Sequence, residues 1–255
     1  MKKQQPKKFQ IKTKSSSGEL SNREKFYELF KRSPIPSNEL LFDLGLYMNR
    51  QALSRVLFMH DLYKQILNVH GIIIEFGVRW GQNLALFSSF RGMYEPFNHT
   101  RKIVGFDTFS GFPTVSAKDG KDQIVAEGAY GVSEGYEKYL AAVLDYHEQE
   151  SPLSHMKKYE LVKGDAVETV QKYLADHPET IIAMAYFDFD LYEPTKKCLA
   201  AIKGHLTKGS VLGFDELNWP PFPGETLALK EELGLDHYSI RRSPLNPTPS
   251  YIVID

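Results

Sequence analysis

The chain has 255 residues, of which 42% are hydrophobic, and a formal net charge of −1 at pH 7. This length suffices for one large α/β core, and the balanced charge argues against nucleic acid or an anionic membrane as a partner. No apolar run is long enough to span a membrane. The single cysteine, Cys198, excludes an internal disulfide and a thiolate metal cluster, and it indicates a reducing, cytoplasmic location.

Residues 1–20 are polar and rich in lysine, and no apolar segment follows the lysines. This pattern predicts a disordered basic tail and not a secretory signal. Residues 21–70 are expected to form an N-terminal helical cap with helices at about 22–31 and 50–69, separated by a proline-containing break. The remaining residues, 71–255, are expected to form one domain.

An apolar run over 72–76 contains one acid, Glu75, and leads into a turn with Gly77 and Gly81. A helical pattern over 82–93 follows. The run predicts a buried parallel strand, and the turn brings the free N–H groups of the next helix toward a ligand. The spacing Glu-x-Gly-x-x-x-Gly fits S-adenosylmethionine (SAM) better than the G-x-G-x-x-G of dinucleotide enzymes.

The rest of the chain alternates strands and helices, which predicts a mostly parallel sheet. Residues 243–249 leave room only for a turn, so the last strand is expected to be antiparallel. Seven strands ending in a hairpin are typical of the Rossmann-like class I SAM-dependent methyltransferase fold. The stretch 111–133 lacks periodicity and is long for a plain connection, so it is expected to be a lid or binding loop. The expected later strands lie near 102–106, 159–163, 181–187, 209–214, 237–241 and 250–254, and the helices near 134–147, 166–175, 192–204 and 225–233.

Acidic residues follow the second and third expected strands. Asp107 is placed to accept both ribose hydroxyls of a nucleoside, although an Asp there also commonly caps a turn. Asp165 is placed either to accept a hydrogen bond from an adenine amino group or to N-cap the helix that starts at Ala166, and the two roles are compatible.

Four more acids follow the next two strands: Asp188 and Asp190, then Asp215 and Glu216. The carboxyl ends of adjacent parallel strands meet at one edge of the sheet, and continued extension would put Asp188 and Asp190 on one side. No Lys or Arg partner is obvious, so the acids would raise one another's pKa unless a hard divalent cation relieved the repulsion. The alternative is that they are solvated loop acids that cap helices.

Three segments together resemble the macrocin O-methyltransferase family, whose members are SAM- and Mg²⁺-dependent and methylate sugar hydroxyls of natural products. They are residues 75–81, 107–113 and 188–195, and the resemblance extends over about 72–235. This chain departs from the family pattern at Phe189, where glycine is usual, and at Glu216, where the metal-binding pair usually has a second Asp.

The resemblance implies site roles. Asp190 would be the catalytic base beside Asp188, and Asp188, Asp215 and Glu216 would hold the metal. The N-terminal helices and the lid would cover the site, and the chain would form dimers or larger assemblies. The residues implied to line the cofactor are Glu75, Phe76, Gly77, Trp80, Gly81, Asp107, Thr108, Asp165, Ala166 and Asp188.

The sequence therefore predicts a SAM- and divalent-metal-dependent O-methyltransferase acting on a hydroxyl of a sugar or glycosylated small molecule. Chelation of a metal suits a vicinal diol, so a catechol acceptor stays open. A nicotinamide-dependent dehydrogenase is a further alternative, disfavoured by the missing G-x-G-x-x-G. The last alternative is a non-catalytic binding protein with the same fold, which the retained carboxylates disfavour.

Overall fold

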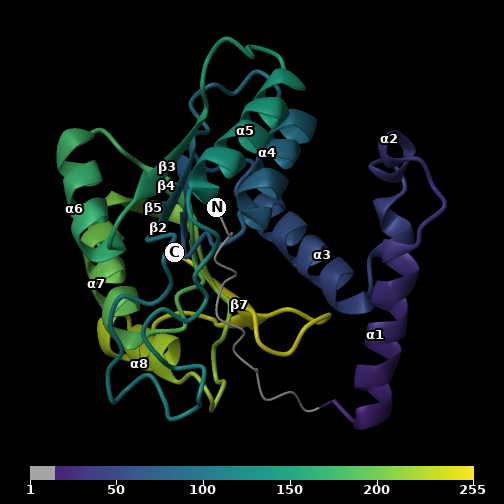
Figure 1. Cartoon of the computed structure of the whole chain (residues 1–255). Helices are drawn as coiled ribbons and strands as arrows, with labels where there is room; N and C mark the ends of the chain where they lie inside the picture. The colour runs from purple at the N-terminus through teal and green to yellow at the C-terminus, as the bar shows by residue number, and fades with distance from the viewer. Residues whose placement is uncertain (1–14) are drawn as a thin grey trace.

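The computed structural model describes residues 15–255 (Figure 1). Residues 1–14 of the expected tail lie outside this range. At residues 17–20 the expectation of disorder is wrong, because helix α1 spans Ser17–Lys31. Ser16 caps this helix by accepting a hydrogen bond from the backbone N–H of Glu19, whose carboxylate accepts from the backbone N–H of Ser16. This reciprocal capping box satisfies two backbone donors at the helix start.

The rest of the N-terminal segment contains one predicted helix and two short elements that the sequence did not predict. Helix α3, Arg50–Gln65, is capped by Asn49, whose side chain accepts from the backbone N–H of Ala52 at 2.9 Å. The unpredicted elements are the short helix α2, Ser37–Leu40, and the 3₁₀ helix η1, Leu44–Tyr47.

The seven-stranded sheet confirms the predicted fold class. Its order is β3-β2-β1-β4-β5-β7-β6, with β1 to β5 parallel and β7 antiparallel to both neighbours. Strand β6 is much shorter than the expected 237–241 and contains two residues. The strands are β1 Ile72–Phe76, β2 Ile103–Asp107, β3 Tyr159–Lys163, β4 Ile182–Phe187, β5 Leu206–Phe214, β6 Arg241–Arg242 and β7 Ser250–Val253.

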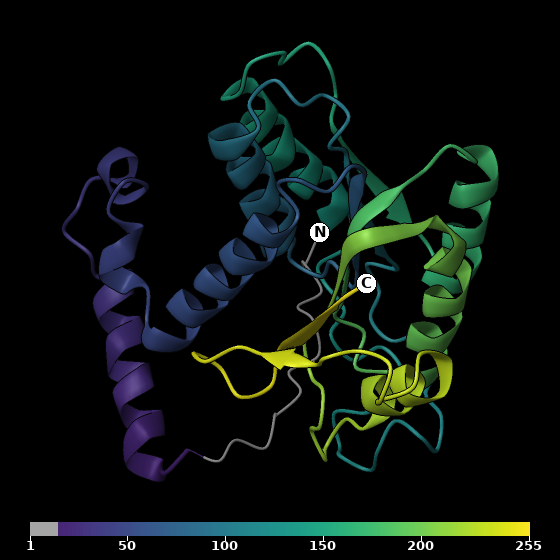
Figure 2. The same ribbon diagram turned by 180° about the vertical axis from the view of Figure 1, so that it is seen from behind.

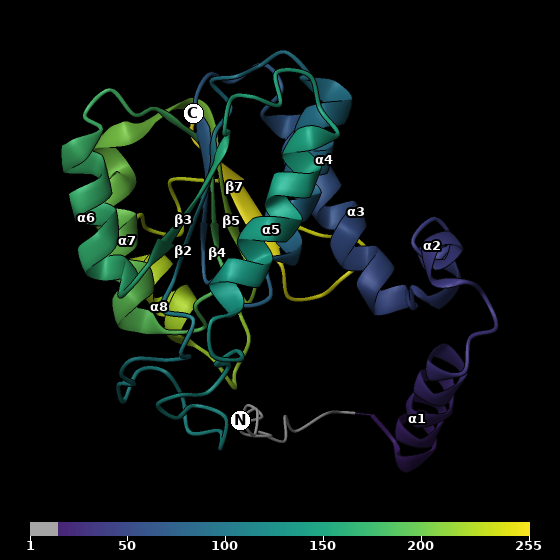
Figure 3. The same ribbon diagram turned by 45° about the horizontal axis from the view of Figure 1, so that its top comes forward.

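Helices cover both faces of the sheet (Figures 1 and 3). One face carries α3, α4 and α5, the other α6, α7 and α8, and each side buries its own apolar cluster. Within residues 15–255, no helix has the length and apolarity needed to cross a membrane. The bounds are α4 Gln82–Tyr94, α5 Tyr136–Gln149, α6 Ala166–Asp176, α7 Tyr192–Ile202, η2 Lys203–His205 and α8 Gly224–Glu232.

The turn after the central strand β1 packs directly on the end of β4. The backbone N–H of Asp188 donates to the carbonyl of Phe76 at 2.8 Å. Gly77 has φ +87°, and a Cβ built there would lie 2.0 Å from the carbonyl oxygen of Asp188. Only glycine fits such a position, so Gly77 fixes the distance between the two strand ends that carry the polar residues described below.

We expect Gly77→Ala to destabilise the fold far more than Gly135→Ala. Both glycines have positive φ, but a Cβ at Gly135 meets nothing within 4 Å. Gly135→Ala should therefore cost only the left-handed strain of about 1–2 kcal/mol, whereas Gly77→Ala must also push two strands apart. Urea unfolding of both variants gives the comparison, and equal free energies of unfolding would show that the close approach at Gly77 is unimportant.

Candidate active site

A pocket of about 370 Å³ opens at the carboxyl ends of the parallel strands. This volume is the size of a site for one small molecule, at the lower end of the usual range of about 300–1,000 Å³. The structure brings most of the predicted site residues together in its lining: Gly77, Trp80, Gly81, Asp107, Thr108, Asp165, Ala166, Asp188, Asp190, Asp215 and Glu216.

Two predicted residues, Phe76 and Glu75, do not line the pocket. The Phe76 side chain is buried in the core, with its ring centroid 5.0 Å from that of Phe187. Any contact of Phe76 with a ligand would therefore come from its backbone. Glu75 is buried beneath the pocket, where one carboxylate oxygen accepts from the side-chain amide of Asn83 at 2.6 Å and the other has no partner.

Asp107 is held in place by the backbone around it. One carboxylate oxygen accepts from the N–H of Arg79 at 2.7 Å, and the other accepts from the N–H of Phe109 at 2.5 Å. Burial raises the pKa of Asp107, and these two amides oppose the rise. Asp107 therefore caps the turn, and the two hydrogen bonds hold its carboxylate in a fixed position in the pocket lining.

Asp165 also has a capping role. Its side chain accepts from the backbone N–H of Val167 at 2.9 Å and so caps α6. The residue lines the pocket as well, so its position is compatible with both of the roles expected from the sequence.

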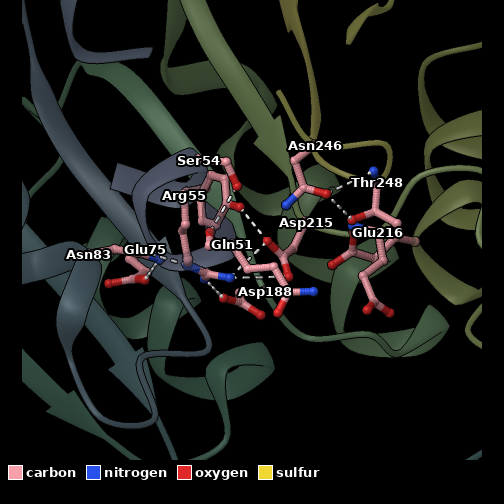
Figure 4. A network of polar contacts seen from close by, with 12 residues as sticks. Gln51, Ser54, Arg55, Glu75, Asn83, Asp188, Asp215, Glu216, Asn246 and Thr248 are labelled. Carbon is pink, nitrogen blue, oxygen red and sulfur yellow. Dashed lines mark hydrogen bonds and ion pairs between the residues drawn. The ribbon is translucent and has the colours of Figure 1, made fainter. Parts of the chain in front are cut away.

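An arginine lies among the carboxylates, and the expectation that they lack a basic partner is wrong. Arg55 of α3 pairs with Asp188 at 2.5 Å and with Asp215 at 3.2 Å. Its Nε donates to the side chain of Asn83 at 3.4 Å, which connects the pair to Glu75 (Figure 4). No local pattern indicates this contact, because Arg55 is 133 residues from Asp188.

One guanidinium does not balance all the acids at this edge. Burial, followed by the charge of Asp215, raises the pKa of Asp188 to about 6 and that of Glu216 to about 8. Burial also raises the pKa of Glu225, which is fully buried and accepts from the backbone N–H of Glu216. One carboxylate oxygen of Glu216 is buried without a hydrogen-bond partner.

Asp190 reaches the pocket by a route different from the one expected. Strand β4 ends at Phe187, and Asp190 has φ +62°, so the alternation of an extended strand does not apply. Its side chain nevertheless lines the pocket and is only 7% exposed. Burial and the neighbouring carboxylate of Glu216 raise its pKa well above the usual range.

The donor chemistry of this edge fits a hard divalent cation, since all the side chains offer oxygen and negative charge is in excess. The unpartnered oxygen of Glu216 supports the same fit. Across residues 15–255, however, no three His, Cys, Asp or Glu side chains are placed to hold a metal ion. Arg55 lies where the carboxylates of Asp188 and Asp215 approach each other.

The segment 111–133 contributes a pocket residue that the sequence did not identify, Tyr130. The guanidinium of Arg79 lies 4.7 Å from the ring centroid of Tyr130, and both residues line the pocket. Tyr130 belongs to the predicted lid, and that prediction was its only signal. Buried Asp119 anchors the same segment by accepting from the backbone N–H of Tyr192 at 2.5 Å.

Comparison with known proteins identifies the family. No protein-family profile and no curated protein matches the chain. Among solved structures, the calicheamicin methyltransferase CalS11 is 46% identical, with 94% of each chain covered and a TM-score of 0.91. An apo structure of CalS11, described as a TDP-rhamnose 3'-O-methyltransferase, is 43% identical over 94% of this chain and 96% of that one, with a TM-score of 0.83.

The chain belongs to the family of this sugar O-methyltransferase. The O-methyltransferase NovP is 18% identical over 79% of each chain, and its TM-score of 0.59 shows likeness of fold alone. The chain is therefore a SAM-dependent O-methyltransferase, and the dehydrogenase and non-catalytic alternatives fall away.

We expect the metal-free methyltransferase to lose stability as pH rises from about 4 to about 8. Asp188 and Glu216 bind their protons more tightly in the folded chain than in the unfolded one. Between these pH values the folded state holds more protons than the unfolded state. Raising the pH therefore lowers the free energy of unfolding, by an amount on the order of a few kcal/mol. Denaturant unfolding in EDTA at several pH values measures the slope.

Glu216→Gln should flatten that slope, because the side chain no longer titrates. The control is Glu179→Gln, at a side chain that is 78% exposed. A slope that is the same in the wild-type protein and in Glu216→Gln would contradict the assignment.

Proposed function

We propose that this methyltransferase transfers the methyl group of SAM to a hydroxyl of a sugar, and that the sugar is carried on a nucleotide. The observation that carries the proposal is the pocket, which joins a fixed acceptor, Asp107, to a group of buried carboxylates. The substrate class is supported by CalS11, which acts on TDP-rhamnose. The finer assignment to the macrocin O-methyltransferase type, and the cytoplasmic location, stay predictions.

The cofactor would lie along the ends of β1 to β3. Asp107 would accept the ribose hydroxyls, since its carboxylate is fixed by two amides and keeps lone pairs free. Asp165 would face the adenine amino group. The turn over 77–81 would pass beneath the methionine part, close to Asp188. In this arrangement the sulfonium lies near the carboxylates, which favour its positive charge.

Asp190 would act as the base. A sugar hydroxyl is a weak nucleophile near pH 7, so a base must remove its proton as the oxygen attacks. The oxygen forms a bond to the methyl carbon, the carbon–sulfur bond breaks, and its electron pair returns to sulfur. The proton passes to the ionised carboxylate of Asp190, and because burial raises the pKa of this group, its ionised form is a stronger base than an exposed Asp. Positioning of the two reactants supplies the rest of the rate enhancement.

We expect Asp190→Asn to abolish methyl transfer but to leave SAM affinity within a few fold of wild type. Asp107→Ala should instead weaken SAM binding, by about 1.5–3 kcal/mol for each lost charge-assisted hydrogen bond. Calorimetry with SAM and mass-spectrometric detection of methylated TDP-rhamnose separate the two effects.

A folded Asp107→Ala variant with unchanged SAM affinity would exclude the ribose role. Methylation of a catechol in preference to any nucleotide sugar would exclude the proposed acceptor.

The cation site would be formed by Asp188, Asp215 and Glu216, and a bound Mg²⁺ would lower the pKa of an acceptor hydroxyl. Arg55 bears directly on this proposal, because it now pairs with two of the three ligands. A cation that binds both carboxylates must displace the guanidinium, so Arg55 should weaken metal binding.

We expect Arg55→Gln to bind Mn²⁺ at least tenfold more tightly than the wild-type protein, because a competing positive charge is removed. Titration calorimetry measures this affinity without any need for activity. Arg32→Gln, at an exposed arginine of the N-terminal segment, is the charge-matched control. Weaker Mn²⁺ binding in Arg55→Gln than in the control would show that Arg55 orients the ligands and does not compete.

A further inference from the structure

Two arginines line the pocket, and their surroundings differ. Among the described residues of the lining, only Arg55 and Arg79 carry a positive charge. The guanidinium of Arg55 is paired with Asp188 and Asp215. That of Arg79 makes no ion pair within residues 15–255 and stacks instead on the ring of Tyr130. Arg79 is therefore the cation of the lining whose N–H donors are available to a ligand.

The backbone fixes Arg79 at the pocket. The residue lies in the turn over 77–81 with φ +48°, a left-handed conformation that residues other than glycine rarely adopt. Its own backbone N–H donates to Asp107 at 2.7 Å. Strained residues of this kind persist only where the surrounding structure imposes the conformation, and they cluster at ligand sites. Arg79 is also exposed, so its side chain belongs to the part of the lining that faces solvent.

The ring of Tyr130 supports the guanidinium. Its centroid lies 4.7 Å from the guanidinium carbon of Arg79, close enough for the attraction between a cation and an aromatic face. Tyr130 has a left-handed φ of +61° as well, and its ring meets that of Phe112 edge-on, with centroids 5.3 Å apart. Because stacking uses the face of the guanidinium, the N–H donors along its edge stay free.

The segment 111–133 that carries Tyr130 is itself anchored to the rest of the domain. Figures 1 and 2 show it as the teal loop that passes beside α8. Within this segment Ile124 and Ala129 are buried, and both pack with buried Phe222, which precedes α8. The ring of Tyr130 is thus held by contacts of the protein and does not need a ligand to place it.

The charge of the pocket indicates which ligand requires this cation. The acids of the lining, among them Asp188, Asp190 and Glu216, outnumber the two arginines. SAM has a net positive charge, because its sulfonium and ammonium groups outweigh its carboxylate, so an excess of acids attracts it. A nucleoside diphosphate is an anion, and the same acids repel it. The acceptor proposed above therefore needs a free cation in the pocket, and Arg79 is available.

Tyr130 connects this cation to the proposed base. Burial, followed by the charges of Asp190 and Glu216, raises the pKa of Tyr130, so these two acids lie near its hydroxyl. The face of the same ring meets Arg79. A ligand that spans Tyr130 would therefore have its anionic part at Arg79 and its other end at Asp190.

We propose that Arg79, supported by Tyr130, binds the diphosphate of the nucleotide sugar and so selects acceptors that still carry their nucleotide. A guanidinium presents paired N–H donors that match two phosphate oxygens at once. With the diphosphate at Arg79, the sugar reaches inward past Tyr130 to Asp190, and the nucleoside extends outward. The inference rests on the proposed function, because it assigns the part of the acceptor beyond the methylated sugar.

The test compares TDP-rhamnose with methyl rhamnoside, which offer the same sugar with and without the diphosphate. We expect Arg79→Gln to lower the ratio of the two kcat/KM values by about tenfold or more, chiefly through a higher KM for TDP-rhamnose. Its Kd for SAM, measured by calorimetry, should stay within about twofold of wild type, since the side chain and not the backbone N–H is changed. Arg79→Lys keeps the charge without the paired donors and should fall between.

Arg241→Gln is the matched control. Arg241 is also exposed, and its guanidinium lies 5.9 Å from the ring centroid of Tyr251, outside the pocket lining. This variant removes the same charge and the same kind of stacking, and it should keep the wild-type preference for TDP-rhamnose.

Calorimetry with TDP alone, in the presence of S-adenosylhomocysteine, measures the same contact without catalysis. The affinity of the wild-type protein should fall as salt is added, because screening weakens the ion pair. Arg79→Gln should bind TDP more weakly and with a flatter salt dependence. Tyr130→Leu removes the aromatic support and should also weaken binding, whereas Tyr130→Phe keeps the ring and should lose less.

Equal TDP affinity in wild type and Arg79→Gln would overturn the inference, and continued methylation of TDP-rhamnose would show that the proposed function stands without it. Weaker SAM binding with unchanged TDP binding would assign Arg79 to the carboxylate of the cofactor and would likewise overturn the inference. A wild-type enzyme that binds no TDP and methylates both rhamnose compounds equally would overturn the nucleotide-sugar acceptor itself, and this inference with it.

Discussion

The ion pairs of Arg55 with Asp188 and Asp215 are the interaction on which the site depends. The pocket edge gathers acids that follow β4 and β5, and burial makes their charges costly. A guanidinium with several fixed donors can contact two carboxylates at once. Because Arg55 belongs to α3, the edge of the sheet is complete only when that helix is docked against it.

Because Arg55 lies on α3, the N-terminal segment contributes a residue to the site. The core of the domain buries one side of α3, and nothing in the described chain covers the other. An element exposed along one side is more readily displaced than one packed all round. Displacing α3 and relieving the carboxylates with a cation would thus both break the contacts of Arg55 with Asp188 and Asp215.

Much of the fold could be predicted because its signals are local. The apolar run at 72–76, the two glycines after it and the regular alternation of strands and helices each follow from a few adjacent residues, and the sheet order confirms them. The misses are equally physical. Strand β6 has only two residues, too few for a pattern to define its bounds. Helix α1 begins within a serine-rich stretch whose composition predicts disorder, and its start depends on the reciprocal hydrogen bonds of Ser16 and Glu19.

From the sequence, only those site residues that directly follow a strand could be predicted. Asp107, Asp165 and the later acids follow strands, and parallel strands end at one edge of the sheet. Arg55 and Asn83 lie on helices, where nothing in the local pattern distinguishes them from other polar helical residues. The excess of negative charge in the predicted site nevertheless indicates that a basic partner such as Arg55 is needed. Buried carboxylates that converge without a cation in view require one, and Arg55 meets part of this requirement by pairing with Asp188 and Asp215.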